Sequence, residues 1–217
     1  MGKGEKMTVP YWDDVSKNNN LYQMGLFPHR EFLLDTLSNL GVKNILDVGC
    51  GTGPIYDLIT NYPYRKWSFV YKGIDPSEGM IKSCRVHFPN GKFEVGNASH
   101  LMESDNSWEC VLMLHSLDYV YDYQPVIQEM ARVASTYVVI VLFRSIIYEK
   151  GLKSKLHNEE HVDINLDWKY ATLQEFAWSD LEVEFMKNNL QVILVEDGKK
   201  INPDNKQNTV IILRKHD

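Results

Sequence analysis

The sequence predicts an α/β protein built on a doubly wound sheet of seven strands, mostly parallel, with an antiparallel last strand. Short apolar runs alternate along the chain with segments in which apolar residues recur every three to four positions, as strands alternate with helices. A glycine-rich stretch follows the first apolar run, where such a sheet turns into a helix. The last two predicted strands are joined by a short polar connection, which indicates that they pair in antiparallel.

The predicted elements follow one another without an internal repeat, a low-complexity tract or an interdomain linker. We expect helices over residues 28–40, 54–60, 77–88, 123–133 and 179–189, and strands over 43–48, 69–74, 91–95, 107–114, 137–143, 190–195 and 209–214. Gly41 suits the end of the first helix, and residues 134–136 suit a short turn. Ser179, followed three positions later by Glu182, is typical of a capping box.

Composition favours one globular domain over residues 1–217, since 44% of the chain is hydrophobic. A net charge of −6 without a Lys/Arg run makes a nucleic-acid partner improbable. The longest apolar run, 138–143, is far shorter than a membrane span, and the charged N-terminus lacks the apolar region of a signal peptide. Cys50, Cys84 and Cys110 are widely spaced and suit a reducing compartment. We therefore expect a cytoplasmic protein with no membrane contact.

The most informative stretch is residues 45–54, Ile-Leu-Asp-Val-Gly-Cys-Gly-Thr-Gly-Pro. It predicts a buried strand that carries a carboxylate, a tight turn with three alternating glycines, and a helix that begins at a proline. Glycine allows a sharp reversal, a close ligand approach or close helix–strand packing. A dinucleotide site needs Gly-x-Gly-x-x-Gly, and here the third glycine comes one residue early, which disfavours nicotinamide and flavin dinucleotides. The alternative is a glycine-rich turn without a ligand.

Residues 47–53 resemble motif I of the class I S-adenosylmethionine-dependent methyltransferases, Asp/Glu-x-Gly-x-Gly-x-Gly, in the strand–turn–helix context that the motif requires. The resemblance extends over about residues 28–214. It implies a Rossmann-like methyltransferase fold with strand order 3-2-1-4-5-7-6, S-adenosylmethionine as cofactor, and methyl transfer as the activity. The family usually has a Pro-Gly-Gly turn before the fifth strand, and Ala-Ser-Thr at 134–136 departs from that pattern.

Asp75 ends the second predicted strand, 26 positions after Gly49. Its two oxygens could accept hydrogen bonds from both hydroxyls of a ribose. The alternative is a turn or N-cap aspartate, which the following Pro76 and Ser77 would suit. After a matching motif I, we favour the ribose contact.

The resemblance assigns further cofactor contacts. Asp47 would hold the methionine ammonium, the three glycines would border the methionine and ribose, and Asn97 with Ala98 would meet the adenine. Met80 would cover an adenine face or belong to the core. The expected cofactor-binding residues are Asp47, Gly49, Cys50, Gly51, Gly53, Asp75, Pro76, Met80, Asn97, Ala98 and His115.

His115 is the titratable residue best placed for catalysis, because it follows a central strand whose end should face the ligand crevice. Its usual pKa suits a general base near neutral pH. The alternative is a packing or backbone contact beside the methionine moiety.

Two segments lie outside the regular pattern. Residues 1–27 would form a lid over the cofactor or pack against a flank of the sheet. Residues 144–178 show no periodicity and would form a variable insertion on the substrate side. Its polar residues His157, Glu160, His161 and Asp163 could bind a metal by composition. A solvated polar loop is the commoner explanation, so we expect no metal centre.

The acceptor has no comparable signature. The Asn/Asp-Pro-Pro-Tyr/Phe signature of amide and adenine-amine methylation is absent after the fourth strand, where Leu-His-Ser-Leu stands at 114–117. A Pro-Cys nucleophile for cytosine is absent too. We therefore expect a small-molecule acceptor. The alternatives are a non-catalytic S-adenosylmethionine-binding sensor or partner-activating subunit, and a dinucleotide oxidoreductase.

Overall fold

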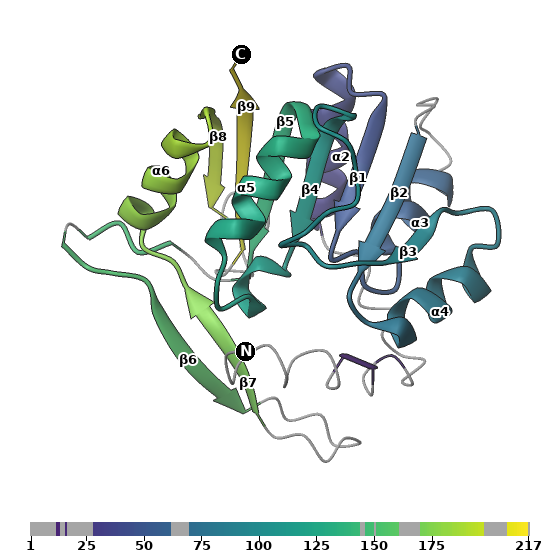
Figure 1. The fold of residues 1–217 in the computed structure, drawn as a ribbon, viewed down its shortest axis with the longest axis horizontal. Coiled ribbons are helices and arrows are strands. Elements are labelled where there is room, and N and C mark those ends of the chain that lie inside the picture. The colour runs from purple at the N-terminus through teal and green to yellow at the C-terminus, as the bar shows by residue number, and fades with distance from the viewer. Residues whose placement is uncertain are drawn as a thin grey trace.

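The computed structural model describes residues 12–13, 16, 28–61, 70–143, 146–149, 151–160, 170–197 and 208–216. Seven strands form one sheet in the order β3-β2-β1-β4-β5-β9-β8, and β6 with β7 forms a separate two-stranded sheet (Figure 1). The elements are α2 (Pro28–Asn39), β1 (Asn44–Val48), α3 (Pro54–Asn61), β2 (Val70–Asp75), α4 (Glu78–His87), β3 (Phe93–Val95), β4 (Trp108–Leu114), the 3₁₀ helix η2 (Leu117–Tyr119), α5 (Gln124–Val133), β5 (Ala134–Leu142), β6 (Lys155–Glu160), β7 (Tyr170–Glu175), α6 (Trp178–Lys187), β8 (Leu190–Asp197) and β9 (Thr209–Lys215).

The predicted topology is confirmed, including the antiparallel last strand. Strand β1 pairs in parallel with β2 and β4, and β4 pairs in parallel with β5. Strand β9 lies between β5 and β8 and runs antiparallel to both. Asp47 in β1 is opposite Gly73 in β2 and Leu112 in β4, so these three strands end at the same edge of the sheet. That edge is where doubly wound sheets bind ligands.

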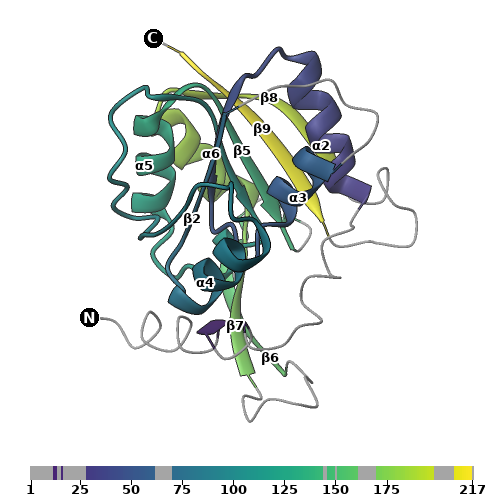
Figure 2. The same ribbon diagram turned by 90° about the vertical axis from the view of Figure 1, so that its right-hand side faces the viewer.

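Helices cover both faces of the sheet (Figure 2). Buried side chains of α2, α3 and α4 pack with one face, and those of α5 and α6 pack with the other. The central strand β5 is buried on both faces, and its residues 138–142 are at most 1% exposed. This burial explains why its sequence is a continuous apolar run rather than an alternating one. Among the described residues, no helix is both long enough and apolar enough to cross a bilayer.

The turn predicted at residues 134–136 is wrong. Helix α5 ends at Val133, and β5 begins at Ala134. Ala134 pairs with Trp108, and the register between β4 and β5 shifts between Trp108 and Cys110. This irregularity absorbs the extra residue, so the helix passes into the strand without a separate turn.

The predicted capping box at the start of the last helix is also wrong. Helix α6 begins at Trp178 with Ala177 at the N-cap, and no side chain makes a capping hydrogen bond. Asp180 instead accepts a hydrogen bond from the backbone N–H of Ser154 and pairs with Lys153 at 2.8 Å. Contacts with the chain that leads into β6 therefore replace the local cap.

The segment 144–178 contains a hairpin that periodicity did not predict. Strands β6 and β7 pair in antiparallel from Lys155 opposite Glu175 to Glu160 opposite Tyr170. Figure 1 shows the hairpin beyond the end of the sheet at which β1, β2 and β4 finish. His161 and Asp163, named as possible metal ligands, lie outside the described residues. The part of the chain that the structure describes contains no group of three or more His, Cys, Asp or Glu arranged to hold a metal.

Candidate functional site

A cavity of about 680 Å³ lies at the carboxyl ends of β1, β2 and β4. All but one of the residues expected to bind the cofactor line it: Asp47, Gly49, Cys50, Gly51, Asp75, Pro76, Met80, Asn97, Ala98 and His115. Gly53 is not among the lining residues. A Cβ atom at Gly53 would lie 3.0 Å from the Phe88 ring, so this glycine allows close packing between α3 and α4.

The glycine turn closes against two neighbouring strands. The backbone N–H groups of Gly49 and Cys50 both donate to the Ile74 carbonyl, at 2.7 and 3.0 Å. A Cβ at Gly49 would lie 2.4 Å from Ser116 Oγ, and the Ser116 hydroxyl donates to the Gly49 carbonyl at 3.1 Å. Gly51 has a φ of +54°, and a Cβ there would meet nothing within 4 Å. The backbone of Gly51 therefore borders open space in the cavity, where a ligand can approach closely.

Asp75 holds the turn and faces the cavity. Its Oδ2 accepts a hydrogen bond from the Gly51 N–H, and its Oδ1 accepts one from the Ser77 N–H, both at 2.9 Å. Each carboxylate oxygen has a second lone pair, so both can still accept a ribose hydroxyl. Burial raises the pKa of Asp75, against the two backbone hydrogen bonds. The turn role and the ribose role are therefore compatible, and the ribose contact stays a prediction.

Asp47 is buried at the base of the cavity, with 2% of its surface exposed. Its Oδ2 accepts a hydrogen bond from the Tyr71 hydroxyl at 2.6 Å. Burial raises the pKa of Asp47 from 3.8 to about 6, although the Tyr71 hydrogen bond and the Arg30 charge both lower it. The carboxylate is thus placed to attract a cationic group of a ligand.

Sequence analysis missed Arg30, which lines the same cavity from α2. Burial lowers the pKa of Arg30 to about 10, against the attraction of Asp47. The sequence carried a signal for it. Arg30 lies three and seven positions before Leu33 and Leu37, both fully buried, so it shares the apolar face of its helix. A cation on an apolar helical face marks a buried polar site.

At the expected adenine end, Asn97 already holds a turn. Its Oδ1 accepts hydrogen bonds from the Ser99 N–H at 3.0 Å and from the Ser99 hydroxyl at 2.8 Å. A contact from Oδ1 to an adenine amine would compete with these bonds. The side-chain amide of Asn97 and the backbone of Ala98 stay predicted contacts, as does Met80, which lines the cavity and is 4% exposed.

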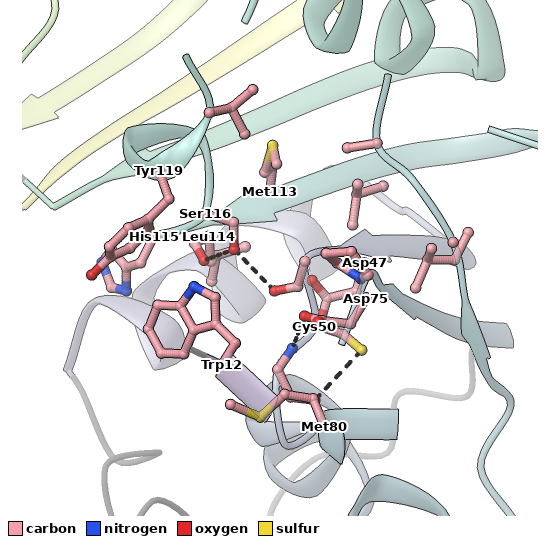
Figure 3. Close-up of a pocket in the computed structure, with 18 of the residues that line it drawn as sticks. Trp12, Asp47, Cys50, Asp75, Met80, Met113, Leu114, His115, Ser116 and Tyr119 are labelled. Carbon is pink, nitrogen blue, oxygen red and sulfur yellow. Dashed lines mark hydrogen bonds between the residues drawn. The ribbon is translucent and has the colours of Figure 1, made fainter. Parts of the chain in front are cut away.

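The opposite side of the cavity is aromatic. Trp12 meets Tyr119 edge-on with ring centroids 5.1 Å apart, and the His115 ring lies 4.8 Å from that of Phe143. Figure 3 shows Trp12, His115 and Tyr119 on one side and Asp47 with Asp75 on the other. We call these sides the aromatic half (Trp12, His115, Tyr119, Phe143) and the carboxylate half (the turn 49–51, Asp47, Asp75). Sequence analysis had named only His115 of the aromatic half.

His115 has a left-handed backbone, with φ of +54°, which is uncommon for a residue other than glycine. Its N–H donates to the Val141 carbonyl at 2.8 Å, which fixes this bend at the end of β4. Such conformations cost free energy and cluster at functional sites. The geometry directs the chain from β4 into η2 along the cavity wall.

The N-terminal segment reaches the rim of the cavity at Trp12 and Asp13. Asp13 Oδ1 accepts a hydrogen bond from the Ser77 hydroxyl at 2.5 Å and one from the Gly79 N–H at 3.0 Å, at the start of α4. These contacts fit both expectations for the segment, a lid over the cofactor and packing against a flank of the sheet. Most of residues 1–27 lie outside the described residues, so the lid stays a prediction.

Comparisons with known proteins agree with this architecture. Residues 46–141 match a family model described as a methyltransferase domain. The ubiquinone/menaquinone biosynthesis C-methyltransferase of Campylobacter jejuni is 28% identical over 109 residues, which cover 49% of this chain and 46% of that protein. Ajmaline N-methyltransferase of Rauvolfia serpentina is 29% identical over 106 residues, which cover 46% of this chain and 35% of that protein. The chain thus spans about half or less of the length of these relatives.

A solved structure of an S-adenosylmethionine-dependent methyltransferase from Methanosarcina mazei has the same fold. Its TM-score is 0.61 at 20% identity, and the match covers 80% of this chain and 92% of that one.

The chain has the sheet order of the methyltransferase fold, with an antiparallel strand inserted next to the edge, and a cavity at the glycine turn. Residues 46–141 therefore match a methyltransferase domain, and the fold is the one seen in a solved S-adenosylmethionine-dependent methyltransferase. S-adenosylmethionine is the cofactor that this likeness suggests. The residues present fit that cofactor. The open backbone at Gly51, the free lone pairs of Asp75 and the ionisable Asp47 suit a ribose and an ammonium group, and the cavity volume is in the range of small-molecule sites.

Proposed function

We propose that the protein transfers a methyl group from S-adenosylmethionine to a small molecule bound in the aromatic half of the cavity. The single observation that carries this proposal is the continuity of one cavity between the carboxylate half and the aromatic half. Two ligands held in these halves would lie next to each other, as a direct transfer between them requires.

The chemistry is an in-line displacement. A nucleophilic atom of the acceptor forms a bond to the methyl carbon while the carbon–sulfur bond breaks, and the electron pair of that bond stays on sulfur in S-adenosylhomocysteine. A proton lost by the acceptor passes to water or to a base. Because the methyl group is already activated, the protein contributes mainly by alignment, which can lower a barrier by about 7–11 kcal/mol.

Each half of the cavity has a separate task in this proposal. Asp47, Asp75 and the glycine turn hold the cofactor, while the aromatic half binds the acceptor and excludes water. Aromatic walls favour a flat, apolar acceptor, because rings pack against each other edge-on or offset. His115, in the aromatic half, is the candidate base. An amine acceptor needs only to be neutral, whereas a hydroxyl acceptor needs to lose its proton.

The relatives support a small-molecule acceptor but not one particular atom. One is named for carbon methylation in quinone biosynthesis, and the other for nitrogen methylation of an alkaloid. Which atom of the acceptor is methylated therefore has to be inferred from this chain's own cavity. The aromatic half is the part of the cavity on which that choice depends.

The first test is a thermal shift with S-adenosylhomocysteine, S-adenosylmethionine and NAD in parallel. A ligand at about 100 times its dissociation constant adds about 2.7 kcal/mol to the stability of the folded protein. We expect both sulfur ligands to stabilise the protein and NAD to leave it unchanged.

Turnover is then measured as S-adenosylhomocysteine release against a panel of flat phenols, amines and quinols. Activity that falls when Phe143 is replaced by Ala supports the acceptor site. Binding of both sulfur ligands without turnover on any acceptor would favour a non-catalytic binding protein instead.

A further inference from the structure

Tyr71 is a phenol whose hydroxyl reaches across to the neighbouring strand. It lies on β2 two residues before Gly73, which is opposite Asp47, so Tyr71 is a diagonal neighbour of Asp47 on the same face of the sheet. Its side chain is 5% exposed, and its ring packs against Tyr56 and Phe93 with centroids 5.2 and 5.9 Å apart. These contacts fix the ring, so the hydroxyl has a defined position.

The hydroxyl of Tyr71 donates to only one oxygen of the Asp47 carboxylate, Oδ2. Asp47 also lines the cavity. The other oxygen, Oδ1, can accept hydrogen bonds from a ligand in the cavity. The hydrogen bond from Tyr71 to Oδ2 thus fixes the orientation in which the Asp47 carboxylate accepts a ligand group.

Burial is the largest influence on the pKa of Asp47, and its neighbours oppose it only in part. Arg30 from α2 and Tyr71 from β2 favour the ionised carboxylate, while burial and Asp75 at the end of β2 disfavour it. The buried thiols of Cys50 in the glycine turn and Cys110 in β4 also interact with the Asp47 charge, and their own pKa values are raised. The resulting pKa of Asp47, about 6, lies close to neutral pH. Loss of one favourable partner would therefore leave much of Asp47 protonated at pH 7.

We propose that Tyr71 is a positioning residue for the cofactor, whose hydroxyl holds the Asp47 carboxylate toward the α-ammonium of the methionine moiety. This inference rests on the proposed function, because it assumes that the cavity binds S-adenosylmethionine with its methionine end at Asp47. Tyr71 itself touches no ligand. Its effect is confined to the amino-acid end, and the adenosine end is held by other residues.

The test compares Tyr71→Phe with wild type in calorimetric titrations between pH 5 and pH 7.5. Two probes separate the ends of the site: S-adenosylhomocysteine carries the amino-acid end, and 5′-methylthioadenosine lacks it. A hydrogen bond to a charged group contributes enough to move a pKa by about one to two units. We therefore expect S-adenosylhomocysteine to bind about two- to tenfold more weakly to Tyr71→Phe at pH 7, with the loss shrinking as the pH rises. Affinity for 5′-methylthioadenosine should be unchanged.

Tyr56→Phe is the matched control, because it removes the same atom from the same ring cluster. It should bind both probes as wild type does. Wild type supplies a second measurement that needs no variant. With a pKa of about 6 at Asp47, its affinity for S-adenosylhomocysteine should be about tenfold lower at pH 5 than at pH 7.

Equal weakening of both probes by Tyr71→Phe would overturn the inference, because it would indicate a general packing role. An unshifted pH profile would overturn it too. In both cases the proposed function would stand, since wild type would still bind S-adenosylhomocysteine. Failure of wild type to bind either probe at any pH would refute the proposed function and, with it, the premise of this inference.

Discussion

Gly51→Val should abolish cofactor binding. Its loss of folding stability should equal that of Gly41→Val, a substitution at a glycine outside the cavity. Gly51 and Gly41 both have left-handed backbones, with φ of +54° and +74°, and a Cβ at either position would meet nothing within 4 Å. Gly51 lines the cavity, whereas Gly41 follows α2 and does not. A side chain at a left-handed position costs about 1–2 kcal/mol. For a chain of this size, the melting temperature should fall by about 2–8 °C in both variants.

The assay is thermal unfolding of wild type, Gly41→Val and Gly51→Val, with and without S-adenosylhomocysteine. Both variants should lose similar stability without ligand, because the backbone strain is the same. Only Gly51→Val should lose the upward shift that the ligand produces, since its side chain would occupy the ligand's path. A full ligand shift in Gly51→Val would refute the assignment of the glycine turn to the cofactor.

Three further changes test the surroundings of the cavity. His115→Ala should retain S-adenosylhomocysteine binding and, with a hydroxyl acceptor, lose about 10²–10⁴-fold in turnover; an unchanged rate would exclude a role as base. Asp118→Asn should lower the unfolding free energy by about 1–3 kcal/mol, because both Asp118 oxygens accept from the Phe143 N–H at 3.0 and 3.1 Å; an unchanged melting temperature would count against it. Asp13→Ala should speed dissociation of S-adenosylhomocysteine, followed by tryptophan fluorescence in stopped flow, if residues 12–13 close the cavity as a lid; an equal rate would argue that they only pack there.

The carboxylate half could be predicted from the sequence because its residues belong to short contiguous stretches. The turn at 49–53 and the strand end at Asp75 each carry a local pattern, and parallel pairing then brings the two together. Gly53 shows the limit of such patterns. It belongs to the motif, yet its closest neighbour is the Phe88 ring rather than the cavity.

The aromatic half could not be predicted in this way. Trp12, Tyr119 and Phe143 come from three separate parts of the chain and meet only in the folded cavity. In the sequence, nothing distinguishes any of them from an aromatic residue of the core. The hairpin β6–β7 escaped notice for a different reason. It forms a two-stranded sheet of its own, so the alternation of strands and helices that predicts the main sheet does not include it.

The raised pKa of Asp47 leads to a prediction that separates a binding role from a structural one. Its pKa is raised from 3.8 to about 6, so the folded protein holds this proton more tightly than the unfolded chain does. The contribution of Asp47 to stability is therefore fully present below pH 3.8 and is lost as the pH rises through 6. The loss is about 3 kcal/mol, at about 1.4 kcal/mol per pKa unit.

Asp47→Asn removes this titration. Its unfolding free energy should gain on that of wild type between pH 4 and pH 7, as measured by urea unfolding, and a difference that does not vary with pH would contradict the reasoning. The ammonium group of a ligand would stabilise the ionised form of Asp47, which predominates at higher pH. S-adenosylhomocysteine should therefore stabilise wild type more at pH 7 than at pH 5. Together these two results would show that the ionised Asp47 lowers the stability of the empty protein and raises that of the liganded protein. Packing alone would favour a neutral residue at this buried position, so a ligand would account for the carboxylate.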